Sequence, residues 1–258
     1  MTTSNSSRVI VITGANNGIG LALTRSLLAM GDRVAALDLD IEELDPSHPN
    51  LLPFRCDVTQ PQQIQTVIDE VLSRWGRVDV LINNACLALF IPFEERCLED
   101  IRREFEVNYF GYLNMIRAVL PVMKKQGHGV VHNFSSGVGY TGIPGMTGYT
   151  STKGAIESLT RTLALEYASQ GIVFNVMHPP LTRTKSSSGL GVPPEMMADP
   201  AMVGLKLAKQ VGKISPVLAP DFGNRFQLWV SYHFRVPMGK LLAMMTERAK
   251  TAGGAKGN

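Results

Sequence analysis

The feature that most constrains the fold is a regular alternation between short apolar runs and longer segments whose apolar residues recur at helical spacing. A continuous apolar run is typical of a strand that is covered on both faces. Six strands are expected on this basis, at 8–13, 33–38, 51–56, 78–83, 129–134 and 171–178. Helices are expected at about 21–28, 62–75, 98–124 and 149–169. This alternation predicts an α/β fold, an open parallel sheet with helices on both faces that binds ligands at the carboxyl ends of its strands.

Length and composition favour one large domain and exclude several classes of protein. The 258 residues are 45% hydrophobic and 18% charged, which allows a substantial core and excludes intrinsic disorder for the bulk of the chain. One domain over 1–258 is expected, with its core at about 8–220 and loose ends at 2–7 and 251–258. The net charge of +3 includes no basic block, so no nucleic-acid partner is expected.

Cysteine spacing and hydropathy predict a cytoplasmic protein without a metal. Cys56, Cys86 and Cys97 form no C-x-x-C pair, and the histidines show no metal-ligand spacing, so free thiols in a reducing compartment are expected. The sequence contains no run of 18 apolar residues, and its polar start lacks the apolar core of a signal peptide. These features predict a soluble, cytoplasmic location.

A glycine-rich segment, TGANNGIG, follows the first expected strand directly. Gly14, Gly18 and Gly20 would let the backbone turn tightly and approach a diphosphate, whose charge would lie against the N-terminus of the next helix. The spacing is G-x-x-x-G-x-G, and glycine-rich turns also join strands to helices for steric reasons alone. The place of this segment after the first strand favours a nucleotide site.

Asp38 closes the second expected strand, 18 residues after Gly20. A carboxylate at this place can accept hydrogen bonds from both adenosine ribose hydroxyls and would repel a 2′-phosphate. The neighbours Asn16, Asn17 and Leu39 are uncharged and could not bind such a phosphate. Asp38 could also be a simple turn or cap residue, but with a dinucleotide site accepted the pattern favours NAD over NADP.

Polar residues also follow the third and fourth expected strands, with Asp57 after the third and Asn83, Asn84 and Ala85 after the fourth. Both places face the expected adenine end of the cleft. Either set could instead satisfy backbone groups at the strand ends. The glycine loop is the reason to consider them as nucleotide contacts.

Four residues are candidates for catalysis. Tyr149 and Lys153 form Y-x-x-x-K at the start of an expected helix, a spacing that puts both side chains on one face. A nearby ammonium, helped by a cationic nicotinamide, is expected to lower the pKa of Tyr149 from its usual value of about 10. Ser136 follows the fifth strand, where its hydroxyl could polarise a substrate oxygen. Asn108 lies inside an expected helix, a poor place for Asn unless its amide has a specific role.

In this order and spacing, the motifs resemble the short-chain dehydrogenase/reductase family over about residues 8–184. The matching segments are TGANNGIG, Asp38, CDV (56–58), NNA (83–85), Asn108, Ser136, YTSTK (149–153) and Asn175 to Thr184. The resemblance implies a Rossmann-like, doubly wound sheet of seven strands. It also implies hydride transfer between NAD(P) and a carbinol carbon, with NAD as the expected cofactor.

The resemblance implies a role for each matching residue. Tyr149 would be the general acid/base, and Lys153 would lower its pKa and hold the nicotinamide ribose. Ser136 would orient the substrate, and Asn108 would help to hold a water that leads protons to the lysine. The implied cofactor contacts, with the pyrophosphate at Ile19 and the carboxamide at Thr184, are Gly14, Asn16, Asn17, Gly18, Ile19, Gly20, Asp38, Asp57, Val58, Asn84, Ala85, Tyr149, Lys153, Pro179 and Thr184.

Two positions depart from the family pattern. Cys86 replaces the glycine of the usual NNAG, and Pro180 replaces the glycine of the usual Pro-Gly pair after the sixth strand. Because proline fixes φ and lacks an N–H, the backbone beside the nicotinamide is expected to follow a different path. Neither change removes a reacting group.

The segments beside the expected pocket indicate an apolar substrate. Residues 185–200 are rich in Ser, Gly and Pro and are expected to be a mobile lid, although an ordinary surface loop has the same composition. Uncharged residues flank the pocket, namely Leu87, Leu89, Phe90, Val138, Tyr140, Ile143 and Met146. They favour an apolar alcohol or ketone, such as a steroid, a retinoid-like or an alicyclic compound, although many of them could simply be core.

The C-terminal segment departs most from the family. Residues 213–220 are expected to be the last strand, and 221–250 to be a helical extension. Phe222, Phe226, Trp229 and Val230 recur at helical spacing, and this stripe could pack on the substrate pocket, form a subunit interface or rest on a membrane. Packing or an interface is favoured over membrane contact. A homo-oligomer is expected, a tetramer as is usual in the family or a dimer.

Two alternatives to the dehydrogenase hypothesis stay open. A redox-inactive NAD-binding sensor or scaffold would need the glycine loop but not Ser136 and Tyr149 together. A sugar-nucleotide epimerase would need a longer chain with a separate substrate domain, for which the sequence leaves no room.

Overall fold

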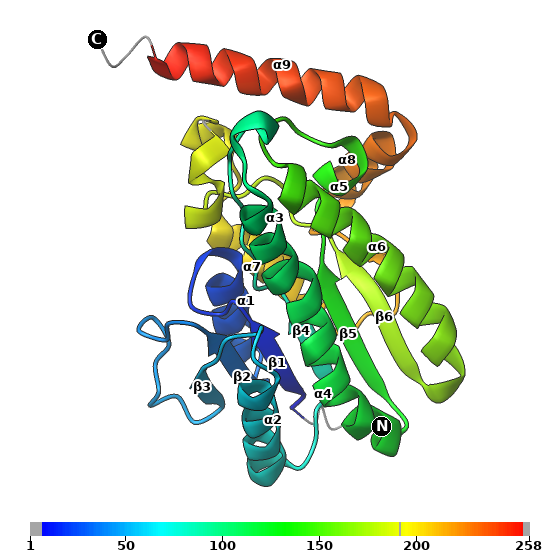
Figure 1. Cartoon of the computed structure of the whole chain (residues 1–258). Coiled ribbons are helices and arrows are strands. Elements are labelled where there is room, and N and C mark those ends of the chain that lie inside the picture. Colours follow the sequence, from blue (N-terminus) through cyan, green and yellow to red (C-terminus); the bar gives the residue numbers. More distant parts are fainter. Residues whose placement is uncertain (1–6, 191, 255–258) are drawn as a thin grey trace.

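The computed structural model describes residues 7–190 and 192–254 (Figure 1), and it contains a seven-stranded, wholly parallel sheet. The strands are β1 (Val9–Thr13), β2 (Arg33–Asp38), β3 (Leu51–Arg55), β4 (Val80–Asn83), β5 (Gly129–Phe134), β6 (Ile172–Met177) and β7 (Val217–Leu218). Their order across the sheet is β3-β2-β1-β4-β5-β6-β7. The strands that follow β1 in the chain thus extend the sheet first on one side of β1, through β2 and β3, and then on the other, from β4 to β7. A crevice for ligands opens where the strand order switches sides, between β1 and β4. The predicted fold class is confirmed.

Helices cover both faces of the sheet because alternate side chains of each strand point to opposite faces. In β1, Val9 and Val11 belong to the core beneath one set of helices, whereas Ile10 and Ile12 belong to the core beneath the other. The first face is covered by α2 (Pro61–Trp75), α4 (Gly111–Gln126) and α6 (Thr147–Tyr167), and the second by α1 (Gly18–Ala29) and α7 (Pro200–Ala208). The sequence did not predict α7, which packs closely along α1.

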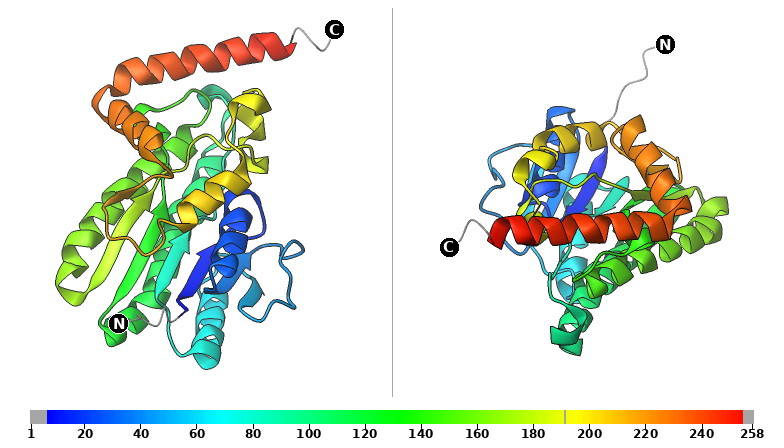
Figure 2. Two further views of the ribbon diagram at one scale, coloured as in Figure 1. Left: turned by 180° about the vertical axis from the view of Figure 1, so that it is seen from behind. Right: turned by 90° about the horizontal axis from the view of Figure 1, so that it is seen from above.

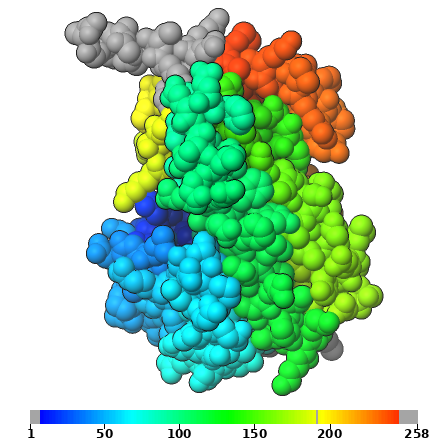
Figure 3. Space-filling model, in the orientation of Figure 1, coloured from blue at the N-terminus to red at the C-terminus, as the bar shows by residue number. Residues whose placement is uncertain are grey.

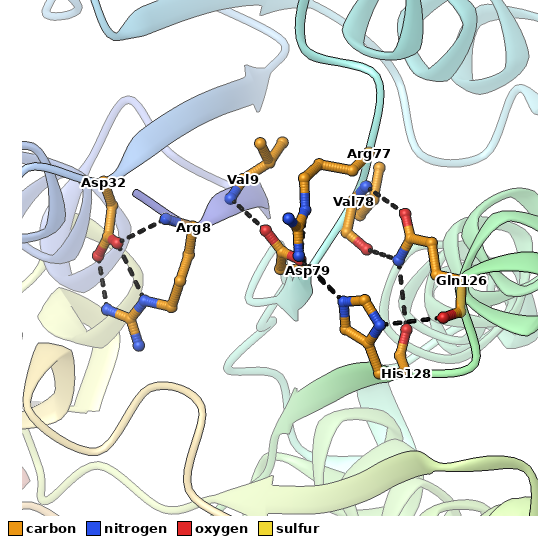
Figure 4. Close-up of polar contacts among 8 residues, drawn as sticks. All are labelled: Arg8, Val9, Asp32, Arg77, Val78, Asp79, Gln126 and His128. Carbon is orange, nitrogen blue, oxygen red and sulfur yellow. Dashed lines mark hydrogen bonds and ion pairs between the residues drawn. The ribbon is translucent and has the colours of Figure 1, made fainter. Parts of the chain in front are cut away.

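Polar side chains fasten the amino ends of the central strands, at the edge opposite the glycine loop (Figure 4). The carboxylate of Asp79, just before β4, accepts a hydrogen bond of 2.8 Å from the backbone N–H of Val9. Gln126, the last residue of α4, donates to the Val78 carbonyl (2.8 Å) and accepts from the Val78 N–H (3.0 Å). His128 also contacts Asp79. These contacts join β1, β4 and the turn before β5 at their starts.

The helix expected over 98–124 is present but is interrupted by a π-helical turn. α3 (Leu98–Phe105) leads into a π turn at Glu106–Phe110, and α4 continues from Gly111. A side chain at Gly111 would lie 2.7 Å from Val58, so the helix approaches that loop closely. Isolated π turns inside α-helices are frequent at functional sites, and this one contains Asn108.

The C-terminal segment forms two helices at the carboxyl edge of the sheet. β7 covers only two residues of the expected strand 213–220, which is interrupted by Pro216 and Pro220. α8 (Phe222–His233) and α9 (Arg235–Gly254) follow, and Figure 2 shows α9 lying across this end of the molecule. The predicted loose tail is wrong for 251–254, which belong to α9, and residues 255–258 lie outside the described part of the chain, as do 2–6 of the expected N-terminal end.

Candidate active site

The glycine loop between β1 and α1 forms one wall of the crevice. Gly14 and Gly18 have φ values of +66° and +50°, which side chains disfavour. A Cβ on Gly14 would lie 2.8 Å from the Cα of Ala85, and a Cβ on Gly20 only 1.9 Å from the carbonyl oxygen of Gly14. Within the described residues, the Asn17 side chain caps none of the N–H groups in the first turn of α1. The loop therefore leaves an uncapped helix N-terminus open to an anionic group.

Asp38 lies at the end of β2 and borders the same cavity. Its carboxylate accepts hydrogen bonds from the backbone N–H groups of Asn16 (2.8 Å) and Leu39 (2.7 Å), which fix its orientation. The side chain of Asn16 is turned elsewhere and accepts from the N–H of Glu43 at 2.8 Å. Asn16 is therefore not among the cavity-lining residues and acts instead through its backbone, by holding Asp38.

Asn84 and Thr13 join the glycine loop to the end of β4. The Asn84 amide donates to the carbonyl oxygens of Thr13 (3.0 Å) and Gly14 (2.9 Å). The Thr13 hydroxyl accepts from the N–H groups of Asn84 and Ala85, each at 3.1 Å. The role of Thr13 was missed because a threonine at the end of a buried strand is common. Asp57 lines the cavity as expected, and its carboxylate orders its own turn by accepting from Thr59.

Tyr149, Lys153 and Ser136 come together in the wall of the same cavity. Tyr149 and Lys153 share one face of α6, and the Lys153 ammonium lies 5.4 Å from the Tyr149 ring centre. The ammonium donates a hydrogen bond of 2.9 Å to the carbonyl oxygen of Phe134, at the end of β5. Ser136 follows that strand and hydrogen-bonds to the Tyr149 phenol. The predicted triad is thus assembled from the end of β5 and the start of α6.

Electrostatics in this triad differ from the expectation. Burial, with a smaller contribution from the nearby Cys86 side chain, raises the pKa of Tyr149, and the hydrogen bond with Ser136 offsets only part of that increase. Burial also lowers the pKa of Lys153, although Cys86 and Glu157 act in the opposite direction. The expected lowering of the Tyr149 pKa is therefore wrong for the protein alone. Desolvation disfavours the charged form of each group, so the phenol is neutral at neutral pH.

Asn108 lies beneath the cavity wall and is fully buried. Its amide donates to the Leu87 carbonyl (2.8 Å), accepts from the Leu87 N–H (2.7 Å) and donates to the Thr152 hydroxyl (3.1 Å). The side chain thereby ties the loop after β4 to α6 next to Lys153. These hydrogen bonds explain why an asparagine, which is unfavourable inside a helix, occurs at position 108.

A buried ion pair between Arg96 and Glu104 was missed by the sequence analysis. Both side chains are inaccessible to solvent and bond to each other directly. Arg96 donates to the Leu89 carbonyl at 2.6 Å, and Glu104 accepts from the Leu89 N–H at 2.9 Å. A side chain on Gly148 would overlap Glu104, so the start of α6 rests directly on this pair. The pair fixes the turn that carries Tyr149.

A second buried pair, His178 and Glu157, lies one helical turn beyond Lys153. The imidazole Nε2 is 2.8 Å from a Glu157 oxygen. Burial alone raises the pKa of Glu157, but hydrogen bonds with His178, Ser135 and Tyr140 outweigh it and hold the pKa below its ordinary value. Glu157 is therefore ionised and places a negative charge near the lysine. Its spacing of four from Lys153 is the one signal that could have suggested it.

The cavity has a volume of about 800 Å³, and the residues that line it apart from the nucleotide loops and the catalytic triad are mainly apolar. This mainly apolar part of the lining consists of Ala88, Phe90, Val138, Thr141, Ile143, Met146, Leu190, Val192, Met196, Asn224, Gln227, Leu228, Ser231, Met238, Leu241, Leu242 and Met245. Four of the apolar residues expected here are present, whereas Leu87, Leu89 and Tyr140 are not among the lining residues. Residues 185–200, the segment predicted to be a lid, contribute Met196 and other side chains to the wall, and α8 and α9 contribute further lining residues.

The remaining predicted cofactor contacts and the two unusual residues also border the cavity. Val58, Ala85, Pro179 and Thr184 line it, as do Ile19 and Lys153. A Cβ on Gly18 would lie 2.8 Å from the Thr184 methyl group, so the glycine loop and this segment approach each other closely. Cys86, Pro179 and Pro180 all face the cavity, which places both departures from the family pattern beside the reacting groups.

Comparison with known proteins agrees with this geometry. A family model described as short chain dehydrogenase matches residues 8–191. The 2-(R)-hydroxypropyl-CoM dehydrogenase of Xanthobacter autotrophicus is 36% identical over 189 residues, which cover 69% of this chain and 76% of that protein. The 3-oxoacyl-[acyl-carrier-protein] reductase FabG of Thermotoga maritima is 34% identical over 229 residues, which cover 83% and 91%.

Two solved structures share the fold. A short chain dehydrogenase from Burkholderia cenocepacia, in complex with NADP, has a TM-score of 0.80 and 27% identity, with 92% of this chain and 98% of that chain covered. A 3-ketoacyl-(acyl-carrier-protein) reductase from Brucella melitensis, complexed with NADH, has a TM-score of 0.75 and 25% identity, with 84% and 98% covered. One of these two neighbours is thus a complex with NADP and the other a complex with NADH.

Proposed function

The chain belongs to the short-chain dehydrogenase/reductase family of enzymes that act on CH–OH groups, and on that premise we propose that it interconverts a hydrophobic secondary alcohol and its ketone with NAD. The observation that carries the proposal is the convergence of Ser136, Tyr149 and Lys153 on one apolar cavity that also borders the glycine loop. A bound nicotinamide dinucleotide would supply the hydride acceptor or donor. The glycine loop, the uncapped start of α1 and Asp38 fit the pyrophosphate and ribose of such a molecule.

Tyr149 handles the proton at the substrate oxygen. Because burial raises the pKa of Tyr149, its phenol is protonated near neutral pH and can donate to a ketone oxygen during reduction. In oxidation the phenolate is required to accept the hydroxyl proton, so the oxidation rate should rise with pH over about 6 to 9. Ser136, bonded to the same phenol, offers a second hydrogen bond to the substrate oxygen.

Lys153 positions the proton-transfer group rather than bonding to it. Its ammonium is anchored on the Phe134 carbonyl and lies 5.4 Å from the ring centres of both Tyr112 and Tyr149. The carboxylate of Glu157 helps to keep that ammonium charged in a buried place. A cation so placed favours the phenolate during oxidation.

The preference for NAD rests on Asp38. The carboxylate borders the cavity between the uncharged residues Asn17 and Leu39. Among the described side chains that line the cavity, Lys153 is the one Lys or Arg, and it lies at the catalytic centre rather than beside Asp38. A 2′-phosphate would thus meet a negative charge and no compensating cation. The wall of apolar side chains between Phe90 and Leu242 supports the hydrophobic substrate.

The test is the rate of NADH formation over a panel of hydroxysteroids, alicyclic alcohols and aliphatic secondary alcohols, with wild type and Tyr149→Phe. Turnover should fall by about 100- to 10,000-fold in Tyr149→Phe, as expected for loss of a general acid/base, while NADH affinity measured by titration stays within about twofold. Turnover that survives in Tyr149→Phe would refute the mechanism. Tight NADH binding with no turnover of any alcohol or ketone would instead favour the NAD-binding sensor hypothesis.

A further inference from the structure

The apolar stripe of α8 is exposed to solvent instead of packing on the protein. Phe222, Phe226 and Trp229 are 83%, 56% and 52% exposed, so the expected packing of these residues on the substrate pocket is wrong. Phe234 and Val236, just beyond the helix, are also exposed. These five residues are called the α8 outer surface below. Figure 3 shows α8 and the described part of α9, in orange to red, projecting at one end of the molecule.

The aromatic side chains of this surface touch one another. Phe226 stacks on Trp229, with ring centres 6.0 Å apart, and Trp229 also contacts His233 (4.5 Å) and Phe234 (6.5 Å). Phe226, Trp229 and Phe234 therefore form one contiguous cluster within the surface, which differs from scattered single apolar residues. Contiguous apolar patches on a protein surface mark interaction sites.

Charge identifies the kind of partner. Residues 222–245 contain three cationic side chains, Arg225, Arg235 and Lys240, and no Asp or Glu. All three cationic residues are exposed. The carboxylate just before the helix, Asp221, is paired with Lys206 at 2.8 Å. This part of the chain thus combines exposed aromatic and aliphatic side chains with three positive charges that no carboxylate within 222–245 offsets. Such a surface complements a lipid layer that is apolar inside and anionic outside.

We propose that the α8 outer surface binds peripherally to the surface of an anionic lipid bilayer. The described residues include no helix long and apolar enough to cross a membrane, so the contact would be interfacial. A second copy of the chain is a poorer partner, because pairing this surface with itself would place the cations of both copies in one interface to which residues 222–245 bring no carboxylate. The opposite face of α8 supplies Gln227 and Leu228 to the cavity, so the bound bilayer would lie next to the cavity wall.

Vesicle sedimentation tests the proposal without any measurement of turnover. The full-length protein is mixed with vesicles of phosphatidylcholine alone or with about 30% phosphatidylglycerol. Each cation near an anionic surface strengthens binding about fivefold, so three should favour the anionic vesicles by about 100-fold. The double variant Phe226→Ser/Trp229→Ser should weaken binding at least about tenfold, and Arg225→Gln/Arg235→Gln/Lys240→Gln should remove the preference for anionic lipid. Leu165→Ser, which changes an 83% exposed apolar residue on α6, is the matched control and should bind like wild type.

Fluorescence locates the contact in the unaltered protein. The chain has two tryptophans, Trp229 and Trp75, and the latter ends α2. Brominated phosphatidylcholine in the anionic vesicles should quench the wild-type emission but not that of Trp229→Phe, which keeps only Trp75. Failure of wild type to bind anionic vesicles, or equal binding by the double variant, overturns the proposal. The proposal is also overturned if sedimentation velocity shows a dimer that does not bind vesicles and that dissociates in the double variant, since the surface would then join two copies.

Discussion

Replacing Asp38 by serine should weaken the discrimination between NAD and NADP. The carboxylate is half-buried and bonded to two backbone N–H groups, so an effective permittivity of about 20 applies, and a second unit charge about 4 Å away would cost about 4 kcal/mol. Wild type should thus bind NADH about 1,000-fold more tightly than NADPH. Asp38→Ser removes this repulsion and also removes charge-assisted bonds to the ribose, each of which contributes about 1.5–3 kcal/mol. The NADH/NADPH affinity ratio should therefore fall at least about 100-fold.

The affinities can be measured before any substrate is known, by titrating the protein with each reduced dinucleotide and following its fluorescence. Asp40→Ser is the matched control, because Asp40 lies two residues further on, is exposed and pairs only loosely with Arg55 at 3.8 Å. Thermal unfolding of both variants checks that the end of β2 is intact. Equal affinity of wild type for NADH and NADPH, or an affinity ratio in Asp38→Ser that matches Asp40→Ser, would refute the reasoning.

Three further predictions concern the scaffold. Buried His132 accepts a hydrogen bond from the Gly212 N–H at 2.9 Å, and burial lowers the pKa of His132 to about 4. Because the unfolded state takes up the proton first, the free energy of unfolding should fall by up to about 3 kcal/mol as the pH drops from about 6.5 to 4. Urea titrations should show a flatter pH dependence of this free energy in His132→Gln than in wild type. Arg96→Met leaves the buried charge of Glu104 unpaired and should lower that free energy by about 3–5 kcal/mol; an unchanged unfolding temperature in calorimetry would contradict this. In Gly20→Ala the added Cβ would lie 1.9 Å from the carbonyl oxygen of Gly14. NADH binding should therefore be lost at NADH concentrations that saturate the wild type in the same titration.

The strands were predictable from sequence because almost all of them are covered on both faces. β1 is buried at every position from Val9 to Thr13, so its sequence reads as an uninterrupted apolar run. The site residues that follow the strands were predictable for the same reason, since the carboxyl ends of parallel strands share one edge. Ser136 and Asn84 could be placed there without knowing which residue each would touch.

The helical pattern of α8 predicted a helix but not its orientation. Spacing shows that Phe222, Phe226 and Trp229 share a face, whereas what covers that face depends on neighbours that the sequence does not reveal. In the structure the cavity side of α8 instead carries residues such as Gln227 and Ser231. The usual inference from an apolar stripe to a buried stripe was therefore wrong here.

Buried charges were the other feature that the sequence could not show. Arg and Glu are mostly exposed in proteins, so Arg96 and Glu104 looked like ordinary surface residues. Their burial depends on Leu89 and Gly148, which approach from other parts of the chain. The π turn at Asn108 also depends on distant contacts, because the side-chain amide of Asn108 forms hydrogen bonds with the loop after β4.

The position of β1 inside the sheet, between β2 and β4, has a consequence for how the molecule is made. Val11 pairs with Ala35 on one side and with Leu81 on the other. During synthesis from the N-terminus, the β1–β2 pair can form early, but the opposite edge of β1 stays unpaired until β4 has left the ribosome. Both walls of the nucleotide crevice, the glycine loop and Asn84, are brought together only at that step. A chain interrupted before residue 80 would carry the complete glycine motif, expose the bare edge of a buried strand to aggregation, and have no crevice in which to bind a dinucleotide.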